Sequence, residues 1–331
     1  MRLVSTAGTV FGLALALLGL AISIPDDESP VLLVANKQGN SLSFVNVTTH
    51  QVEDRVTTGA APHEVAAAPG RQRAYVANYD GGTITVIDVS ARRVETTWPL
   101  TGYSRPHGLA VGPDEERVYV TAEDARAVLE LDAERGNVLR TFETGKDGTH
   151  MLALSSNGRR LYATSIGSGT LSIIHLKSGR VETHIRTGEG AEGVAVHPKT
   201  GEVWVTNRAD DTVAIIDTDR AAVTDTLSVA GFPIRAGVHR SGTHAVVSTP
   251  RLGGVVVLDA QNPAVETRIE TGAKPIGVLP SPRKRRAFIA NSGSKTVSIV
   301  DLESATITDT IRVGRGPDGM AFLAADERPG S

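Results

Sequence analysis

The chain has 331 residues, of which 40% are hydrophobic and 21% are charged. This composition is that of a folded protein with two average domains or one large all-β domain, and it excludes a disordered chain. The net charge of -3 gives no overall attraction to nucleic acid or to an acidic membrane surface. The absence of cysteine excludes disulfides, thiolate metal sites and cysteine nucleophiles.

The N-terminus has the layout of a secretory signal peptide. Arg2 precedes the apolar run VFGLALALLGL at residues 10–20, and small residues near Ser23 are followed by the acidic Asp26. We therefore interpret residues 1–24 as a signal peptide and residues 25–30 as a linker. The alternative is an uncleaved anchor, because residues 7–24 are just long enough to span a bilayer. Both interpretations place the rest of the chain in the periplasm or outside the cell.

The remainder of the sequence is built from seven repeats. The segments LLVAN, AYVAN, VYVTA, LYATS, VWVTN, AVVST and AFIAN recur about every 42 to 44 residues. A second marker keeps the same register at the end of the next apolar run, at Asn46, Asp88, Asp132, His175, Asp217, Asp259 and Asp301. Two landmarks in one register indicate a true repeat from residue 31 to about residue 324, followed by a tail at residues 325–331.

Each repeat predicts four short antiparallel strands. Residues 83–88, TITVID, alternate with period two, and the neighbouring stretches are rich in β-branched residues between Gly, Asp and Asn turns. Four strands in a period of about 42 residues are typical of a β-propeller blade, so we predict an all-β, seven-bladed propeller. The small-residue stretches such as GLAVGP are expected innermost. The last blade then combines a C-terminal inner strand with three N-terminal outer strands, which closes the ring.

The tetrads YVAN, YVTA, YATS and WVTN, with the VID-like and P-x-G elements, resemble the YVTN repeat family of seven-bladed propellers. The resemblance covers the whole chain after the N-terminal segment. It implies the propeller fold, but it does not fix an activity, because similar propellers include surface-layer proteins, periplasmic binding proteins and parts of metalloenzymes. Among the latter, nitrous-oxide reductase holds a copper cluster, and the haem domain of dissimilatory nitrite reductase holds a haem, over the region that begins the inner strands.

The residues that begin the inner strands are the main candidate site. We expect them at one mouth of the central channel, in ring order His63, His107, His150, Glu192, Ile234, Ile276 and Asp318. Imidazoles and carboxylates are suitable ligands for a transition metal, so His63, His107, His150 and Glu192 are a candidate metal set. Asp318 and Arg105, which precedes Pro106, are candidate residues for binding at the same mouth. The alternative is that these groups are solvated residues of the repeat.

Three functions follow from these observations. The preferred one is an exported binding or protein-interaction module that uses the channel mouth and binds a protein or small molecule. The first alternative is a carrier or assembly factor associated with a metal or a haem through His63, His107 and His150. The second is a hydrolase of small esters or lactones, although the sequence contains no G-x-S-x-G, H-E-x-x-H or phosphate-binding glycine loop. We assign no catalytic residue.

Other polar residues are expected to serve the repeat itself. The aspartates that end the third strands suit Asx turns, and Asn36, Asn78, Asn207 and Asn291 suit loop caps with left-handed backbone. The basic run PRKRR at residues 282–286 is predicted on the face opposite the mouth, and we expect a solvated turn rather than a site for nucleic acid or anionic lipid. We expect a monomer that contacts a membrane only through an uncleaved N-terminal segment.

Overall fold

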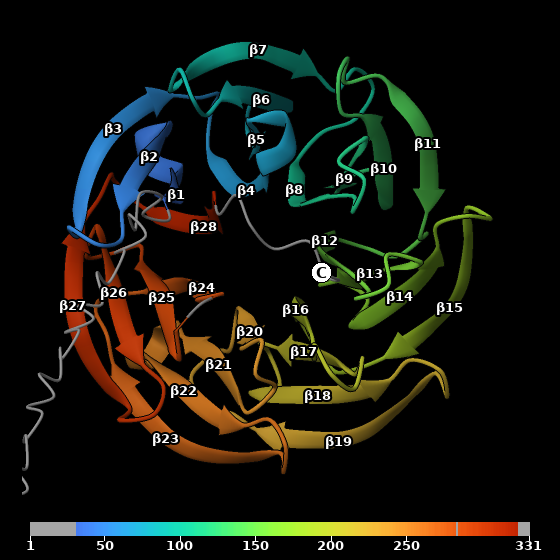
Figure 1. The fold of residues 1–331 in the computed structure, drawn as a ribbon. Coiled ribbons are helices and arrows are strands. Elements are labelled where there is room, and N and C mark those ends of the chain that lie inside the picture. Colours follow the sequence, from blue (N-terminus) through green and yellow to red (C-terminus); the bar gives the residue numbers. More distant parts are fainter. Residues whose placement is uncertain (1–30, 283, 324–331) are drawn as a thin grey trace, which may run out of the picture.

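The computed structural model describes residues 31–282 and 284–323, and these form seven four-stranded antiparallel sheets around a central axis (Figure 1). The prediction of a seven-bladed all-β propeller is therefore confirmed. Blades 1 to 6 take four consecutive strands each, from β4–β7 through β24–β27. Blade 7 has the order β28-β1-β2-β3. No helix in this part of the chain is long and apolar enough to cross a membrane.

The strands of blades 7, 1, 2 and 3 have the following bounds. They are β1 (Val31–Asn36), β2 (Ser41–Asn46), β3 (Gln51–Thr57), β4 (Pro62–Ala68), β5 (Arg73–Asn78), β6 (Thr83–Asp88), β7 (Arg93–Pro99), β8 (Pro106–Val111), β9 (Arg117–Ala122), β10 (Ala127–Asp132), β11 (Val138–Glu143), β12 (Thr149–Leu154), β13 (Arg160–Ser165), β14 (Thr170–His175) and β15 (Arg180–Arg186).

The remaining strands are β16 (Ala191–Val196), β17 (Val203–Asn207), β18 (Thr212–Asp217), β19 (Ala222–Ser228), β20 (Ala236–Val238), β21 (His244–Thr249), β22 (Gly254–Asp259), β23 (Ala264–Glu270), β24 (Pro275–Pro280), β25 (Arg286–Asn291), β26 (Thr296–Asp301), β27 (Thr306–Arg312) and β28 (Pro317–Phe322). Three short 3-10 turns, η1 (Lys37–Gly39), η2 (Pro69–Arg71) and η3 (Pro250–Leu252), lie in loops.

The first strand of each repeat lies innermost, as the sequence predicts. Strands β28, β4, β8, β12, β16, β20 and β24 each contact the next around the ring. Glycine permits this close approach, because a Cβ on Gly277 would come within 2.0 Å of the Asp318 carbonyl oxygen of the next blade. A Cβ on Gly319 would likewise come within 2.5 Å of the His63 carbonyl oxygen. Small residues are therefore required where seven sheets converge.

Apolar side chains from facing sheets fill the space between blades. In one cluster, Tyr75 and Val86 of blade 1 pack with Val120 and Leu129 of blade 2. The ring closes where β28 pairs with β1, with Leu32 opposite Phe322 and the Leu323 amide donating to the Val31 carbonyl. This confirms the predicted closure by a C-terminal inner strand and N-terminal outer strands.

The regular spacing of the polar markers has a local cause. Asp88 accepts hydrogen bonds from the Ser90 and Ala91 amides, and the equivalent aspartates of four other blades close their turns in the same way. The expectation for the asparagines is wrong in one respect. Asn78 is fully buried without a left-handed backbone, and its amide donates to Thr83 and Thr85, so it fixes the β5–β6 hairpin.

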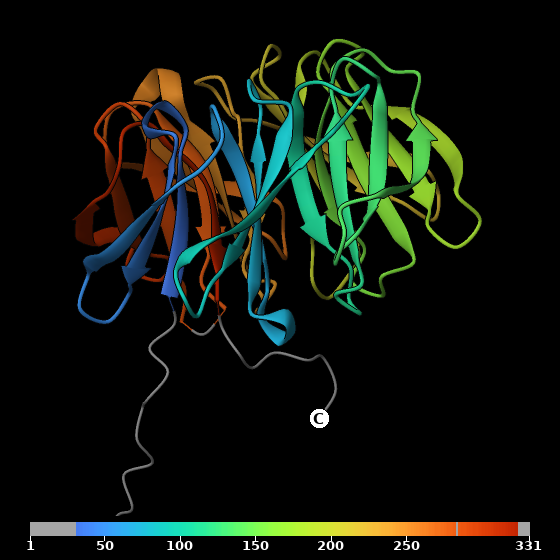
Figure 2. The same cartoon turned by 90° about the horizontal axis from the view of Figure 1, so that it is seen from above.

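The propeller has two distinct faces. All inner strands begin at one face, which we call the mouth face, where the loops between second and third strands also lie. They end at the opposite turn face, where inner strands turn into second strands. The β4–β5 turn with η2 lies on the turn face, drawn at the lower edge of Figure 2.

Candidate functional site at the channel mouth

The structure brings the three predicted histidines together at the mouth. They come from three consecutive inner strands, β4, β8 and β12, and their rings stack in a row. The ring centroids of His63 and His107 are 4.3 Å apart, and those of His107 and His150 are 3.6 Å apart. Tyr79 packs against both His63 and His107. His107, in the middle, is only 1% exposed.

Carboxylates hold the two ends of this row. His63 Nδ1 lies 3.1 Å from Asp318 Oδ2, in an ion pair that lacks hydrogen-bond alignment. At the other end, His150 Nδ1 lies 3.1 Å from Glu123 Oε2, and its Nε2 lies 3.7 Å from Glu192 Oε1. Arg208 donates to Glu192 at 2.6 Å. The predicted residues His63, His107, His150, Glu192 and Asp318 therefore form one group, which we call the mouth cluster.

An ion pair crosses the channel one residue deeper than the histidines. Arg235 Nη2 lies 2.7 Å from Glu64 Oε1, and both side chains are buried. Glu64 is on β4 and Arg235 immediately precedes β20, strands that Figure 1 places on opposite sides of the central opening. Arg235 also lies 3.5 Å from Glu192. The pair forms a charged floor beneath the mouth cluster.

The sequence analysis did not identify Glu64 or Arg235, although a signal exists. They occupy the position after the ring residue, where four other blades carry Gly108, Gly193, Gly277 and Gly319. Two charged residues of opposite sign in a column of small residues indicate a pair within the ring. Which blades face each other could be counted from the repeat order, but whether the side chains meet depends on the width of the channel.

Burial and neighbouring charges give the two inner histidines opposite properties. Burial lowers the pKa of His107 well below its ordinary value, and the charges of His150, His63 and Arg235 lower it further. Burial would also lower the pKa of His150, but its hydrogen bonds to Glu123 and Glu192 outweigh burial and raise that pKa. Burial would raise the pKa of Glu192, but His150 and the two arginines outweigh it and lower that pKa. Two neighbouring imidazoles therefore have pKa values shifted in opposite directions, that of His107 downward and that of His150 upward.

Buried polar atoms without a hydrogen-bond partner gather in this region. Nine buried side-chain atoms of the described residues lack such a partner, and four of them lie here: His63 Nδ1, His107 Nδ1, Asp318 Oδ1 and Arg235 Nη1. A buried polar group without a partner costs free energy, so native proteins contain few of them. Four such atoms at the channel mouth indicate that these polar groups serve a function other than packing the fold.

The mouth loops share a strained backbone position. Two residues before each ring residue, the backbone is left-handed in all seven blades, at Ala61, Arg105, Gly148, Gly190, Phe232, Lys274 and Gly316. Glycine adopts this conformation without strain, whereas a larger residue pays roughly 1 kcal/mol or more. Arg105, Phe232 and Lys274 nevertheless carry large side chains there, with φ of 52°, 64° and 54°. Large side chains are thus kept at the rim against a local preference for glycine.

The rim carries two clusters of arginine and aromatic groups. Arg105 lies over the Tyr79 ring at 5.7 Å and pairs with Asp124 at 3.4 Å, with both side chains about half exposed. Phe232 lies between Arg208 and Arg251, at 5.3 and 4.1 Å. Asp211 holds Phe232 in place by accepting its backbone N–H. The structure therefore places the predicted rim residue Arg105 beside the mouth cluster, and it adds Phe232, which the sequence analysis did not select.

The mouth face has a cationic half. The mouth loops of blades 5, 6 and 7 contain no acidic residue. Besides the buried Arg235 they carry five basic residues, which we call the cationic rim: Lys37, Arg251, Lys274, Lys295 and Arg315. Within residues 31–282 and 284–323, none of the five has an acidic partner within ion-pair distance. The loops of blades 1 to 4 carry seven acidic and four basic residues. The mouth face is therefore bipolar.

The metal hypothesis finds no support in this geometry. A metal needs ligand atoms that converge on one point, whereas the three rings pack against one another in a tilted row, with interplanar angles of 44° and 33°, and His150 is bound by two carboxylates. In the described part of the chain, no three histidine or acidic side chains are placed to hold a metal ion. Because His63, His107 and His150 are buried, none of these three rings is exposed at the surface to coordinate a haem iron. Metal or haem association through His63, His107, His150 and Glu192 stays a prediction.

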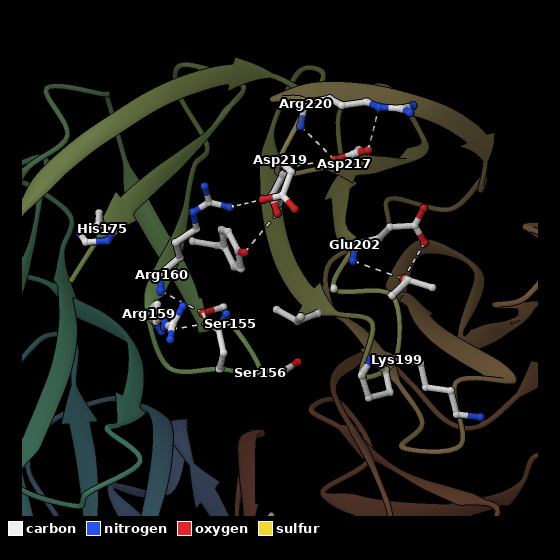
Figure 3. Close-up of a pocket in the computed structure, with 17 residues that line it drawn as sticks. Ser155, Ser156, Arg159, Arg160, His175, Lys199, Glu202, Asp217, Asp219 and Arg220 are labelled. Atoms are coloured by element: carbon white, nitrogen blue, oxygen red, sulfur yellow. Dashed lines mark hydrogen bonds and ion pairs between the residues drawn. The ribbon is translucent and has the colours of Figure 1, made fainter. Parts of the chain in front are cut away.

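The clearest clefts lie elsewhere. Clefts of about 760 and 470 Å³ open on the turn face, between blades 3 and 4 and between blades 1 and 2. Figure 3 shows the larger one, with Arg160 directed across it to Asp219, a contact of 2.6 Å. Arg73 makes the equivalent contact with Glu134 in the smaller cleft. Both clefts are gaps between adjacent blades, and an ion pair between the two blades crosses each of them.

The fold and this site define a seven-bladed propeller whose channel is closed by buried charges and whose mouth is strongly bipolar. The chain belongs to the YNCE-like beta-propeller family. The family model matches residues 7–189, which is more than half of the chain. No sequence among curated proteins matches it significantly.

Solved structures confirm the fold. Hydrazine synthase of Kuenenia stuttgartiensis is similar, with a TM-score of 0.74 and 21% identity over 82% of this chain and 92% of that one. A functionally unknown protein from Desulfotomaculum acetoxidans has a TM-score of 0.75 and 14% identity, covering 90% and 100%. Dihydro-heme d1 dehydrogenase NirN has a TM-score of 0.67 and 14% identity, covering 88% and 75%. At these identities the similarity shows the fold alone.

Proposed function

We propose that the protein is a protein-interaction module that docks an acidic surface of its partner on the cationic rim. The observation that carries this proposal is the set of five basic residues on three neighbouring blades without an acidic partner among the described residues. Unpaired charges of one sign steer association and select an oppositely charged surface. The acidic half of the mouth face fixes the orientation, because a partner turned the other way meets like charge.

A protein partner suits the mouth better than a small molecule does. The residues of the mouth cluster are all less than 10% exposed, and so are Ile234 and Ile276, so the channel entrance is filled by its own side chains. An enclosed small-molecule site needs a cavity that surrounds most of the ligand. A filled mouth with a charged rim instead presents a broad surface. Phe232, held between two arginines, supplies an aromatic contact of the kind enriched in interfaces.

The hydrolase alternative has less support. Its candidate groups, Glu192, Asp318 and the histidines, are already bound to one another or buried. Within residues 31–282 and 284–323, no serine or threonine hydroxyl is hydrogen-bonded to a histidine ring of the mouth cluster, and an ester would need access to such a pair. The ligand named for NirN, DHE, gives a reason to include a haem-type compound in a binding screen, but no described cavity of this chain is matched to it.

Site-directed photocrosslinking tests the docking surface. A photoreactive phenylalanine analogue replaces Lys274 on the rim or, as a control, the exposed Lys177 in an outer turn of the opposite face. We expect a discrete covalent adduct in cells of the source organism from position 274 only. Reversing the charge of Lys295 and Arg315 to glutamate should abolish it. Equal adducts at both positions, or an adduct unaffected by charge reversal, would contradict the proposal.

We also propose that residues 1–24 direct export, so that docking takes place outside the cytoplasm. The Arg2 charge, the apolar run at residues 10–20 and the small residues near Ser23 support this. Fusing residues 1–30 to a phosphatase that is active only after export tests it. Activity that disappears when Leu17 and Leu18 are changed to arginine is the expected result, and activity confined to the cytoplasmic fraction would overturn it.

A further inference from the structure

On the turn face, the equivalent turns of four neighbouring blades each carry an exposed basic residue. The turns from inner to second strand in blades 3, 4, 5 and 6 carry Arg159, Lys199, Arg240 and Lys284, which we call the basic arc. All four side chains are exposed. All four turns follow inner strands, so they lie around the channel at the same end of the propeller.

The acidic residues of this face lie mainly outside the arc. In blade 4, Glu202 is the one acidic residue of the inner turn, and it accepts a hydrogen bond from Thr200. The outer turns carry Asp217, Asp259 and Asp301, whose carboxylates accept backbone amides, and Asp219 and Glu303, which pair with Arg160 and Arg285. The inner turn of blade 2, which adjoins blade 3 at one end of the arc, is acidic and carries Asp114, Glu115 and Glu116. The basic arc thus forms a cationic crescent rather than a uniformly mixed rim.

The chain enters the propeller on this same face. Val31 begins β1 there, next to Leu323, whose amide donates to the Val31 carbonyl. In the sequence, residues 21–30 separate Val31 from the apolar run at residues 10–20. Ten residues span at most about 33–36 Å when extended. An apolar run held in a membrane would therefore keep the turn face near the bilayer surface.

We propose that the turn face docks on the surface of an anionic membrane, with the basic arc contacting phospholipid headgroups. Exposed cations in neighbouring turns at one end of the propeller can contact a charged bilayer surface together. The inner turns of the arc contain no exposed aromatic side chain in the described residues, so they lack the stacking platforms that single-stranded nucleic acid binding uses. The cationic rim would then face away from the membrane, free for a protein partner. The membrane contact does not depend on the function proposed for the mouth.

Sedimentation with lipid vesicles tests this contact. The full chain is mixed with vesicles of phosphatidylcholine alone and with vesicles containing phosphatidylglycerol, at 50 mM and 500 mM salt. We expect phosphatidylglycerol to raise binding by about 25-fold or more, and high salt to remove that gain. The variant Lys199→Glu with Lys284→Glu should lose most of the gain, since each basic residue near such a surface contributes about fivefold.

A matched control distinguishes the effect of where the basic residues lie from the effect of the protein's total charge. The variant Lys274→Glu with Lys295→Glu makes the same charge change on the mouth face, and it should bind vesicles as the unchanged protein does. Binding to vesicles of phosphatidylcholine alone measures the contribution of the apolar run at residues 10–20, which all variants contain. Equal losses in both double variants, or no dependence on phosphatidylglycerol, would overturn the proposal. If the protein bound single-stranded DNA more tightly than phosphatidylglycerol vesicles, and Lys199→Glu with Lys284→Glu weakened that binding, the basic arc would be a nucleic-acid site instead.

Discussion

Glu64 and Arg235 form an ion pair of 2.7 Å across the central channel and so connect blades 1 and 5. Each blade otherwise contacts mainly its two neighbours, as repeat architectures do. The pair is a direct connection between distant blades, and it is buried. Burial raises the pKa of Glu64, whereas three carboxylates around Arg235 outweigh burial and raise its pKa, so the arginine keeps its charge.

Replacing Arg235 with methionine should destabilise the protein by about 3–5 kcal/mol, because it leaves buried carboxylates without their cation. Glu64→Gln should cost less, because Arg235 keeps Glu192 nearby. The double variant Glu64→Leu with Arg235→Met should recover part of the loss. Denaturant unfolding measures all three. A double variant as unstable as the sum of the single ones would show that the two residues do not act as a pair.

The pKa values of His150 and His107 should be shifted in opposite directions. Carboxylates raise the pKa of His150 against the effect of burial, so its contribution to stability is fully present below about 6.5 and is lost as pH rises through the folded value. Burial lowers the pKa of His107, so its contribution is present above about 6.5 and is lost as pH falls. Imidazole NMR signals measure both values. Glu192→Gln should lower the pKa of His150, and an unchanged value would contradict the assigned contact.

Lys274→Gly should stabilise the protein by about 0.5–1 kcal/mol, because Lys274 holds a left-handed backbone that glycine adopts without strain. The same change should weaken the photocrosslinked adduct formed from a neighbouring rim position. Thermal unfolding measures the first effect. Gly148→Ala, which introduces a side chain at the equivalent position with φ of 67°, is the control and should destabilise. Destabilisation by Lys274→Gly would show that the side chain is kept for packing instead.

Loading with Zn²⁺ or Cu²⁺ followed by dialysis should leave no stoichiometric metal at the mouth, because the histidine rings stack instead of converging. Elemental analysis of protein without an affinity tag measures this. His107→Ala provides the comparison for the mouth cluster, and His175→Ala, in an outer turn, provides the comparison for a histidine away from the mouth. One equivalent of metal that disappears only in His107→Ala would restore the metal hypothesis.

Much of the site could be located in the sequence. The repeat register placed His63, His107, His150, Glu192 and Asp318 at one mouth, since a period of one blade converts a spacing of about 43 residues into neighbouring positions on a ring. The stacking of the three rings could not be derived, because it depends on side-chain rotamers and on the carboxylates at each end. Phe232 lies in an irregular loop before the short strand β20, where no sequence pattern marks it.

The sequence by itself determined the number of blades, the four strands in each, the closure of the ring and the polar column at the mouth. These features repeat seven times, so each local signal was reinforced by the others. Only the tertiary structure decided which charges meet. The Glu64–Arg235 pair, the unpaired cationic rim and the basic arc join residues from blades far apart in sequence, and such distances depend on the radius of the ring, which no local pattern encodes.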